Sequence, residues 1–140
     1  MKLLVAGSRD YANQSRTVIK LLDELTLNHP DYHFRDITEV VSGCAKGIDT
    51  AAILWAEQNN IPVKKYPAEW TVNGKTDMAA GFKRNALMAD YCDTAIIIWD
   101  GKSKGTKHMM SELDKRGKEF LLWTKLPVRK MTKKVASSGI

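Results

Sequence analysis

Three short turns in the sequence combine glycine with hydroxyl and basic side chains, which are the residue types that bind phosphate in proteins. They read GSRD at 7–10, SGCAKGID at 42–49 and DGKSKGT at 100–106. Glycine lets a backbone approach an anion closely, and N–H groups at the start of a helix attract negative charge. Each turn alone also fits an ordinary connection between elements. If the fold brings them together, they predict a phosphate-binding site.

The third turn contains Gly101-Lys102-Ser103, which resembles the ending of the P-loop that binds ATP. A P-loop also needs a glycine five residues before the glycine of this ending. Ile96 occupies that position, within the apolar run TAIIIW at 94–99. The sequence therefore excludes an ATP-type P-loop. It predicts that the turn binds phosphate through N–H groups at the start of the following helix.

Side chains that could hold the rest of a ligand lie close to these turns. Trp70 offers a ring on which a base can stack, and Arg84 offers a planar fork of donors for phosphate. A loop packed for its own sake and a solvent-facing arginine are the alternatives for these two residues. Asp49, Asn85 and Asp100 are the candidates for ribose or base contacts. The predicted ligand-binding residues are Gly7, Ser8, Arg9, Ser42, Gly43, Lys46, Gly47, Asp49, Trp70, Arg84, Asn85, Asp100, Gly101, Ser103, Gly105 and Thr106.

The elements that must position these residues alternate along the chain. Apolar, strand-like runs are followed by segments of helical periodicity. The predicted strands cover 3–6, 37–41, 62–66, 94–99 and 119–123. This alternation predicts a Rossmann-like, three-layer α/β fold with a mainly parallel five-stranded sheet in the order 3-2-1-4-5. Ligands bind such sheets beyond the carboxyl ends of the strands, where the strand order reverses, and the three turns fall there.

Length and charge limit the class of protein. The chain has 140 residues and a formal net charge of +6, which suits one domain. Five basic residues and no acidic residue lie from Lys125 onward, leaving 17 basic against 16 acidic residues before it. We therefore predict a nucleotide-binding domain at 1–124 and a basic, solvated, partly disordered tail at 125–140. The near-neutral body favours a free nucleotide over nucleic acid, which the tail keeps as an alternative.

Other residue types point to a cytoplasmic protein without metal or cofactor. Cys44 and Cys92 form no CxxC pair, and no cysteine and histidine cluster has metal-ligand spacing. No apolar run approaches the roughly 18 residues of a membrane helix, so no membrane partner is expected. His108 could donate to a bound phosphate, although an exposed helical histidine is the simpler account.

Five segments, taken in order, resemble the SLOG superfamily of Rossmann-like nucleotide-binding proteins, particularly a small bacterial and phage branch. They span most of the chain before the tail. The resemblance implies a nucleotide-type ligand and a homo-oligomer assembled through helices that flank the sheet. The matching segments are GSRD (7–10), VSGCAKGIDTAAILWA (41–56), YPAEW (66–70), GFKRNALMA (81–89) and WDGKSKGTKHM (99–109).

The chain is also similar to the lonely-guy phosphoribohydrolases, which cleave a base from a nucleoside monophosphate. Arg84 matches their arginine and Gly105-Thr106 match their Gly-Thr pair, but Met109 stands where they have a glutamate. Cleavage of a glycosidic bond needs a carboxylate to stabilise the oxocarbenium-like state or to activate water. We therefore predict nucleotide binding, for sensing or sequestration. Hydrolysis or transfer at an N-glycosidic bond is the alternative, and its candidate catalytic residues are Glu69, Asp100 and Glu112.

A third resemblance is to the DNA processing protein A family, through SGCAKGID at 42–49 and Arg84-Asn85. That family binds single-stranded DNA and loads a recombinase. Single-stranded DNA binding is therefore the second alternative function.

Overall fold

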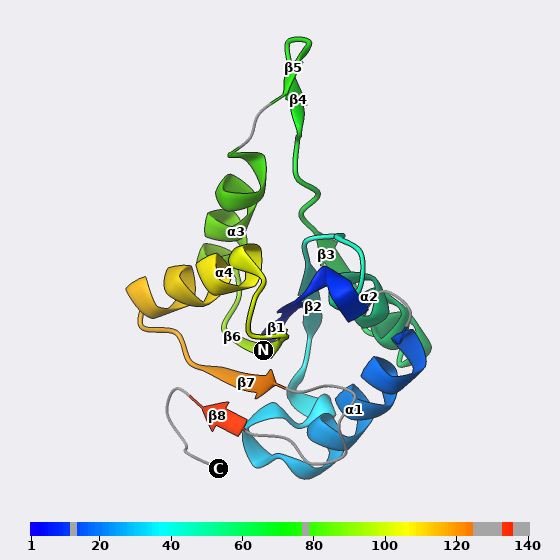
Figure 1. The fold of residues 1–140 in the computed structure, drawn as a ribbon. Coiled ribbons are helices and arrows are strands. Elements are labelled where there is room, and N and C mark those ends of the chain that lie inside the picture. The colour runs from blue at the N-terminus through cyan, green and yellow to red at the C-terminus, as the bar shows by residue number, and fades with distance from the viewer. Residues whose placement is uncertain (12–13, 77–78, 125–132, 136–140) are drawn as a thin grey trace.

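The chain folds into a six-stranded sheet with two helices on each face (Figure 1). This computed structural model describes residues 1–11, 14–76, 79–124 and 133–135. Five neighbouring strands are parallel and follow the order β3-β2-β1-β6-β7, which confirms the predicted fold class and strand order. The parallel strands are β1 (Lys2–Gly7), β2 (Glu39–Ser42), β3 (Val63–Lys65), β6 (Thr94–Trp99) and β7 (Phe120–Thr124).

A sixth strand, which the sequence did not predict, lies at the β7 edge. This strand, β8 (Lys133–Val135), pairs antiparallel with β7. It belongs to the segment 125–140 that the sequence assigned to a basic tail, and the rest of that segment lies outside the described residues. Part of the tail therefore extends the sheet.

Helices cover the two faces in pairs. On one face lie α1 (Ser15–Asn28) and α2 (Ile48–Gln58), and on the other lie α3 (Ala80–Tyr91) and α4 (Lys104–Lys115) (Figure 1). The first pair is joined by a hydrogen bond of 2.8 Å from Trp55 Nε1 to Asp23 Oδ1. In the described part of the chain, short 3-10 helices lie in the connections: η1 (Arg9–Tyr11), η2 (Pro30–Tyr32) and η3 (Phe34–Asp36). No helix within the described ranges is long and apolar enough to cross a membrane.

The core consists of two apolar layers, one on each side of the sheet. Successive residues of a strand point to opposite faces. In β1, Leu3 and Val5 pack toward α1 and α2, whereas Leu4 packs toward α3 and α4. In β6, Ile96 and Ile97 divide in the same way and are fully buried. Each such side chain contributes about 1.5–3 kcal/mol to the free energy of folding, so the central strands are a rigid base for the loops at their ends.

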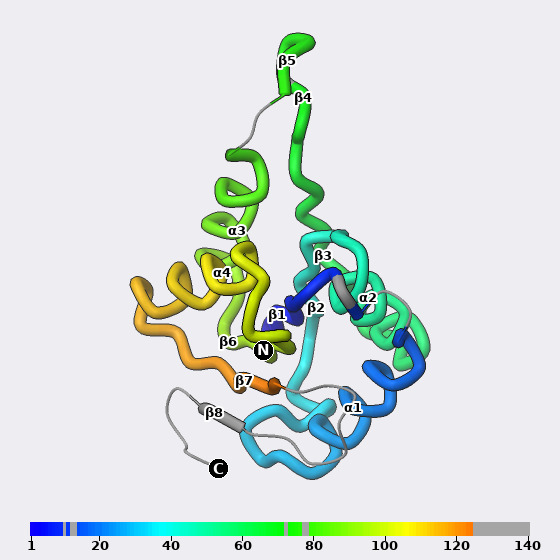
Figure 2. Tube along the Cα trace, in the orientation of Figure 1, coloured from blue at the N-terminus to red at the C-terminus, as the bar shows by residue number. Residues whose placement is uncertain are grey.

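The connection between β3 and α3 carries a hairpin that the sequence did not predict. Its strands are β4 (Thr71–Val72) and β5 (Lys75–Thr76), which pair antiparallel. The two turn residues, Asn73 and Gly74, both have positive φ, as a two-residue hairpin turn requires. Figures 1 and 2 show the hairpin projecting from the body at the carboxyl edge of the sheet.

The junction between β1 and β6 places the first and third turns side by side. The Ser8 N–H donates to the Ile98 carbonyl at 3.1 Å, and Ser8 Oγ accepts from the Asp100 N–H at 3.0 Å. At Gly7, a Cβ atom would lie 2.2 Å from the Ile98 oxygen and 2.6 Å from Ile48 Cγ1. Glycine is therefore required here by the close approach of β6 and α2.

Candidate functional site

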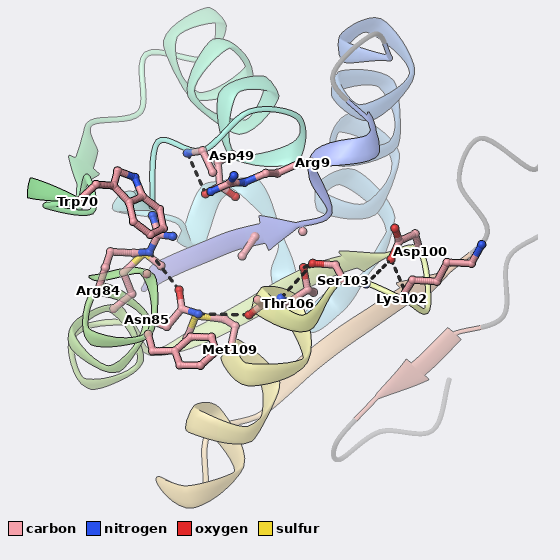
Figure 3. A pocket seen from close by; sticks show the side chains of 17 residues that line it. Arg9, Asp49, Trp70, Arg84, Asn85, Asp100, Lys102, Ser103, Thr106 and Met109 are labelled. Atoms are coloured by element: carbon pink, nitrogen blue, oxygen red, sulfur yellow. Dashed lines mark hydrogen bonds between the residues drawn. The ribbon is translucent and has the colours of Figure 1, made fainter. Parts of the chain in front are cut away.

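A cleft of about 500 Å³ opens at the carboxyl edge of the sheet, where the strand order reverses. Residues from all three predicted turns line it, together with residues of α3 (Figure 3). The fold therefore brings together most of the residues that the sequence singled out. Those that line the cleft are Gly7, Arg9, Asp49, Trp70, Arg84, Asn85, Asp100, Ser103, Gly105 and Thr106.

One wall of the cleft is the first turn of α4. Ser103 is the N-cap residue, and its Oγ accepts a hydrogen bond from the Thr106 N–H at 3.3 Å. The preceding turn is held by Asp100, whose Oδ1 accepts the N–H groups of Lys102 and Ser103, each at 2.8 Å. No acidic residue stands in the first turn of α4, and Gly105 has open space where a Cβ would be. This helix end can therefore receive an external anion.

The other wall carries two arginines and a tryptophan. Arg84 Nη1 donates to the Gly43 carbonyl at 2.6 Å, and its Nε donates to Asn85 Oδ1 at 3.1 Å. The Arg9 guanidinium lies 6.0 Å from the centre of the Trp70 ring, and Trp70 is 44% exposed. Figure 3 shows Arg9, Trp70 and Arg84 at one end of the cleft. This end combines positive charge with a stacking surface.

Gly43 makes room for the arginine wall. A Cβ atom at this position would lie 2.5 Å from Arg84 Nη1 and 2.9 Å from Asp49 Oδ2. Any larger residue would push the guanidinium or the carboxylate away. Although Gly43 does not line the cleft, it fixes how closely Arg84 can approach the second turn.

Asp49 is the buried acid of the site. It lies in the first turn of α2, and its Oδ2 accepts a hydrogen bond from the Ala45 N–H at 3.3 Å. Burial raises the pKa of its carboxyl to about 6, while the bond from Ala45 and the charges of Arg84 and Arg9 act in the opposite direction. Burial also lowers the pKa of Arg84. The charges of Asp49 and the two arginines partly compensate each other.

Part of the cleft lining is apolar, and the sequence did not predict that these side chains would face a ligand. Phe82, Met88 and Met109 line the cleft, and Met109 is only 1% exposed. Phe82, Asn85 and Met88 are spaced three residues apart, so they lie along one side of α3. This spacing was a signal that the sequence analysis did not use. The remaining lining residues that it missed are Ala6, Ala45, Gly81 and Lys102.

Six predicted residues do not line the cleft. Ser8 and Ser42 are buried, and Ser42 Oγ accepts the Cys44 N–H and donates to the Asp49 carbonyl, both at 3.2 Å. Gly47 is also buried at the N-cap of α2, while Lys46 and Gly101 are exposed. The sixth is Gly43. The N–H groups of the second turn at Cys44 and Ala45 are therefore bonded within the protein.

The three catalytic candidates occupy different places. Asp100 lines the cleft, whereas Glu69 and Glu112 do not. Glu112 accepts bonds from Lys115 at 2.8 Å and Arg116 at 3.0 Å, and these bonds hold the pKa of its carboxyl below the usual range. Within the described residues, no group of histidines, cysteines and acids could hold a metal ion.

The sequence of this chain is similar to those of known proteins. Residues 1–72 match the YspA, cpYpsA-related SLOG family (YAcAr). The chain is 32% identical over 122 residues to the Gene 61 protein of Mycobacterium phage D29, covering 83% of this chain and 90% of that protein.

Two solved structures share the fold. DNA processing protein A from Streptococcus pneumoniae matches with a TM-score of 0.67 and 22% identity, over 86% of this chain and 49% of that one. DNA processing protein A from Helicobacter pylori, described with its mode of binding single-stranded DNA, matches with a TM-score of 0.57 and 20% identity, over 87% of this chain and 64% of that one. The chain therefore spans about half to two thirds of these two proteins.

Proposed function

Because the chain belongs to the YspA, cpYpsA-related SLOG family, we propose that it binds a nucleotide or a nucleotide-derived small molecule in the cleft. The observation that carries the proposal is the convergence of Arg9, Arg84 and the first turn of α4 on one cleft beside Trp70. Arginines and a helix N-terminus provide charge and donors for phosphate, and an exposed indole provides a surface for a base. The volume suits a small molecule.

The apolar lining at Met109 favours binding over cleavage. Met109 is buried at the position where a carboxylate would serve a glycosidic hydrolase. A ligand with its phosphate between the arginines and α4 would meet thioether and aromatic groups below it. We propose that the protein senses or sequesters its ligand rather than consuming it.

Mass spectrometry of ligand released from the purified protein tests the proposal, followed by thermal-shift assays with nucleoside monophosphates, nucleoside diphosphates and NAD-like compounds. Arg9→Ala and Arg84→Ala should each weaken binding about tenfold, because each removes a charged donor to phosphate. Arg9 is exposed, so its variant should keep the fold even if Arg84→Ala does not.

Arg16→Ala is the matched control. Arg16 is an exposed arginine on α1, which packs on the face of the sheet opposite to α3 and α4. It should bind as tightly as the wild-type protein. If no nucleotide stabilises the protein, or if the two cleft variants bind like the control, the cleft is not a nucleotide site.

A cationic rim favours single-stranded DNA as a second candidate ligand. Lys46, Lys102, Lys104 and Lys107 are exposed and lie on the second and third turns and the start of α4. Exposed aromatic rings and clustered lysines are the features that bind single strands, and Trp70 is 44% exposed. This candidate is also supported by the structural likeness to DNA processing protein A, whose Helicobacter protein binds single-stranded DNA.

Substitution of Lys104 and Lys107 distinguishes single-stranded DNA from a mononucleotide as the ligand, because neither lysine lines the cleft. For a DNA-binding protein, the double variant Lys104→Ala/Lys107→Ala should lower the affinity for a fluorescent oligothymidylate and flatten its salt dependence. The affinity for a mononucleotide should change less than twofold in that variant. Equal loss for both ligands would contradict this separation.

Cleavage of an N-glycosidic bond is kept as a candidate by Asp49, a buried carboxyl that lines the cleft and whose pKa is raised to about 6. Such a group can act as a general acid near neutral pH. Chromatography after incubation with nucleoside monophosphates should show no free base if the protein only binds. Free base that forms with the wild-type protein and disappears with Asp49→Asn or Asp100→Asn, the two acids that line the cleft, would contradict the binding-only function.

We also propose a homo-oligomer, which the resemblance to the superfamily implies. Leu27, Leu54 and Leu87 on three of the flanking helices are 57%, 41% and 56% exposed, and burial of such side chains against a second copy would stabilise an oligomer. Analytical ultracentrifugation should show a species heavier than the 15.7 kDa chain. A monomer at all concentrations would contradict this proposal.

A further inference from the structure

Asn85 belongs to α3, and its buried side-chain amide contacts residues of both α3 and α4. Its Oδ1 accepts a hydrogen bond from Arg84 Nε at 3.1 Å. Its Nδ2 donates to the Gly105 carbonyl of α4 at 3.2 Å and lies 3.2 Å from His108 Nδ1. Figure 3 shows the links from Arg84 to Asn85 and from Asn85 onward to α4. The amide therefore connects the arginine of one wall to the helix end that forms the other.

These contacts fix the direction in which the amide points. An amide has an acceptor oxygen at one end and two N–H donors at the other. As placed, the oxygen of Asn85 meets the N–H of Arg84, and its nitrogen meets the Gly105 carbonyl and His108 Nδ1. If the Asn85 amide were rotated by half a turn, its oxygen would face the Gly105 carbonyl oxygen and its N–H groups would face the N–H of Arg84. The observed arrangement uses His108 Nδ1 as an acceptor, so it needs an imidazole without a proton on that nitrogen.

The surroundings of His108 favour that neutral imidazole. Its ring stacks on Phe82 of α3 with 4.1 Å between centroids, and its Nε2 lies 3.5 Å from Glu112 Oε2. Burial lowers the pKa of His108, the charge of Glu112 raises it, and the charge of Lys115 lowers it. Arg116 also binds Glu112, at 3.0 Å, which reduces the pull of that carboxylate on a second proton.

We propose that His108 is a positioning residue, which acts through Asn85 to orient the Arg84 guanidinium and so couples ligand binding in the cleft to its own protonation. A proton on Nδ1 would set N–H against N–H between His108 and Asn85. Asn85 would then lose the acceptor at His108, and its amide would no longer be held in one orientation. Arg84 would keep its bond to the Gly43 carbonyl, but its Nε would no longer have an acceptor held in place. The orientation of Arg84 is a property of the free protein, whereas its effect on binding rests on the proposed function.

The first test needs no ligand. We would follow the Arg84 Nε–H resonance and the His108 ring signals by NMR between about pH 5 and pH 7.5, the range in which a histidine titrates. The Arg84 signal should shift or broaden with the same midpoint as His108. In the variant His108→Asn, the side-chain oxygen can replace Nδ1 as an acceptor and does not titrate. The part of the Arg84 shift that follows His108 should disappear in this variant, so that only the shift caused by the charge of Asp49 remains. An Arg84 signal that ignores the His108 titration, or that titrates equally in His108→Asn, would overturn the proposal.

The second test measures the binding of adenosine 5′-monophosphate by calorimetry at both ends of that range. Asp49 and the phosphate of the probe also titrate there, and they do so equally in the wild-type protein and in His108→Asn. The wild-type protein should lose about threefold to tenfold more affinity on acidification than His108→Asn does. His108→Ala should bind weakly at both pH values. Identical pH profiles in the wild-type protein and His108→Asn would overturn the coupling.

The two tests separate the two proposals. If the wild-type protein binds no mononucleotide, the proposed function fails, and the NMR titration still decides whether His108 orients Arg84. If binding occurs and the NMR coupling is absent, the function stands and the positioning role fails.

Discussion

The N-termini of α2 and α4 follow similar glycine-rich turns at the same edge of the sheet, yet only one of them is open. At α2, the Asp49 carboxylate accepts the Ala45 N–H, and Ser42 Oγ accepts the Cys44 N–H. At α4, the cap is the hydroxyl of Ser103, and no acidic residue stands in the first turn. The N-terminus of α2 thus has its own carboxylate, whereas the N-terminus of α4 presents its partial positive charge to the cleft. Similar sequence patterns therefore have different tasks: the turn before α2 is structural, and we propose that the turn before α4 binds the ligand.

Glycine substitutions should show the largest contrast between the two turns. At Gly47 the backbone has φ of +84°, and a Cβ would lie 2.6 Å from the Ser8 carbonyl oxygen. Gly47→Ala should therefore lower the free energy of unfolding by about 2–4 kcal/mol. At Gly105 a Cβ meets nothing within 4 Å. Gly105→Ala should be neutral or stabilising by up to about 1 kcal/mol, because alanine favours a helix.

Urea denaturation of both glycine variants measures this contrast. Equal losses at the two positions would break the distinction between a packed turn and an open one.

The pH dependence of the free energy of unfolding should reveal the buried carboxyl of Asp49 in α2. Its pKa is raised from 3.8 to about 6 in the fold, so the folded state favours the protonated carboxyl. The stability that this protonated carboxyl adds to the fold is fully present below the pKa that Asp49 has in the unfolded chain. It is lost as the pH rises through the pKa that Asp49 has in the folded protein. Asp49→Asn should remove a decline of roughly 2 kcal/mol between about pH 4 and pH 7.

Denaturation curves across that range test the prediction, with the exposed Glu24→Gln on α1 as the control that keeps the decline. A decline that is unchanged in Asp49→Asn would show that this carboxyl is not enclosed as described.

Loss of the N-cap of α4 should lower the free energy of unfolding by a smaller amount. Ser103 Oγ accepts the Thr106 N–H, and loss of such a cap costs about 1 kcal/mol. Ser103→Ala should lower the free energy of unfolding by that amount, while Ser103→Asp should restore it. Because aspartate would also place a negative charge at the open helix end, it should weaken mononucleotide binding. Restored stability with undiminished binding would argue against an anion at α4.

The smallest expected effect compares two exposed lysines. Lys102 lines the cleft beside α4, whereas Lys46 belongs to the second turn and does not line it. Lys102→Ala should lower the affinity for a mononucleotide about threefold at low salt, and Lys46→Ala should change it less than twofold. Calorimetric titration checks both. A larger loss at Lys46 would assign the anion to α2 instead.

Much of the framework could be predicted because it depends on local patterns. The alternation of apolar runs and helical periods gave the parallel sheet and its order, and the turns after β1, β2 and β6 line the cleft as predicted. The hairpin β4–β5 was missed because its strands have two residues each, too few for any alternation to show. The strand β8 was missed because its lysine-rich sequence is typical of a solvated tail.

By itself the sequence determined the layers of the fold and which residues lie at the carboxyl edge, since strand period, helix period and turn chemistry are properties of neighbouring residues. Only the tertiary structure decided the role of each turn. That Asp49 occupies its own turn, that Gly43 must yield to Arg84 and that Asn85 joins two helices all depend on side chains distant in sequence. These contacts arise when the packed sheet brings α2, α3 and α4 together, and no local pattern encodes them.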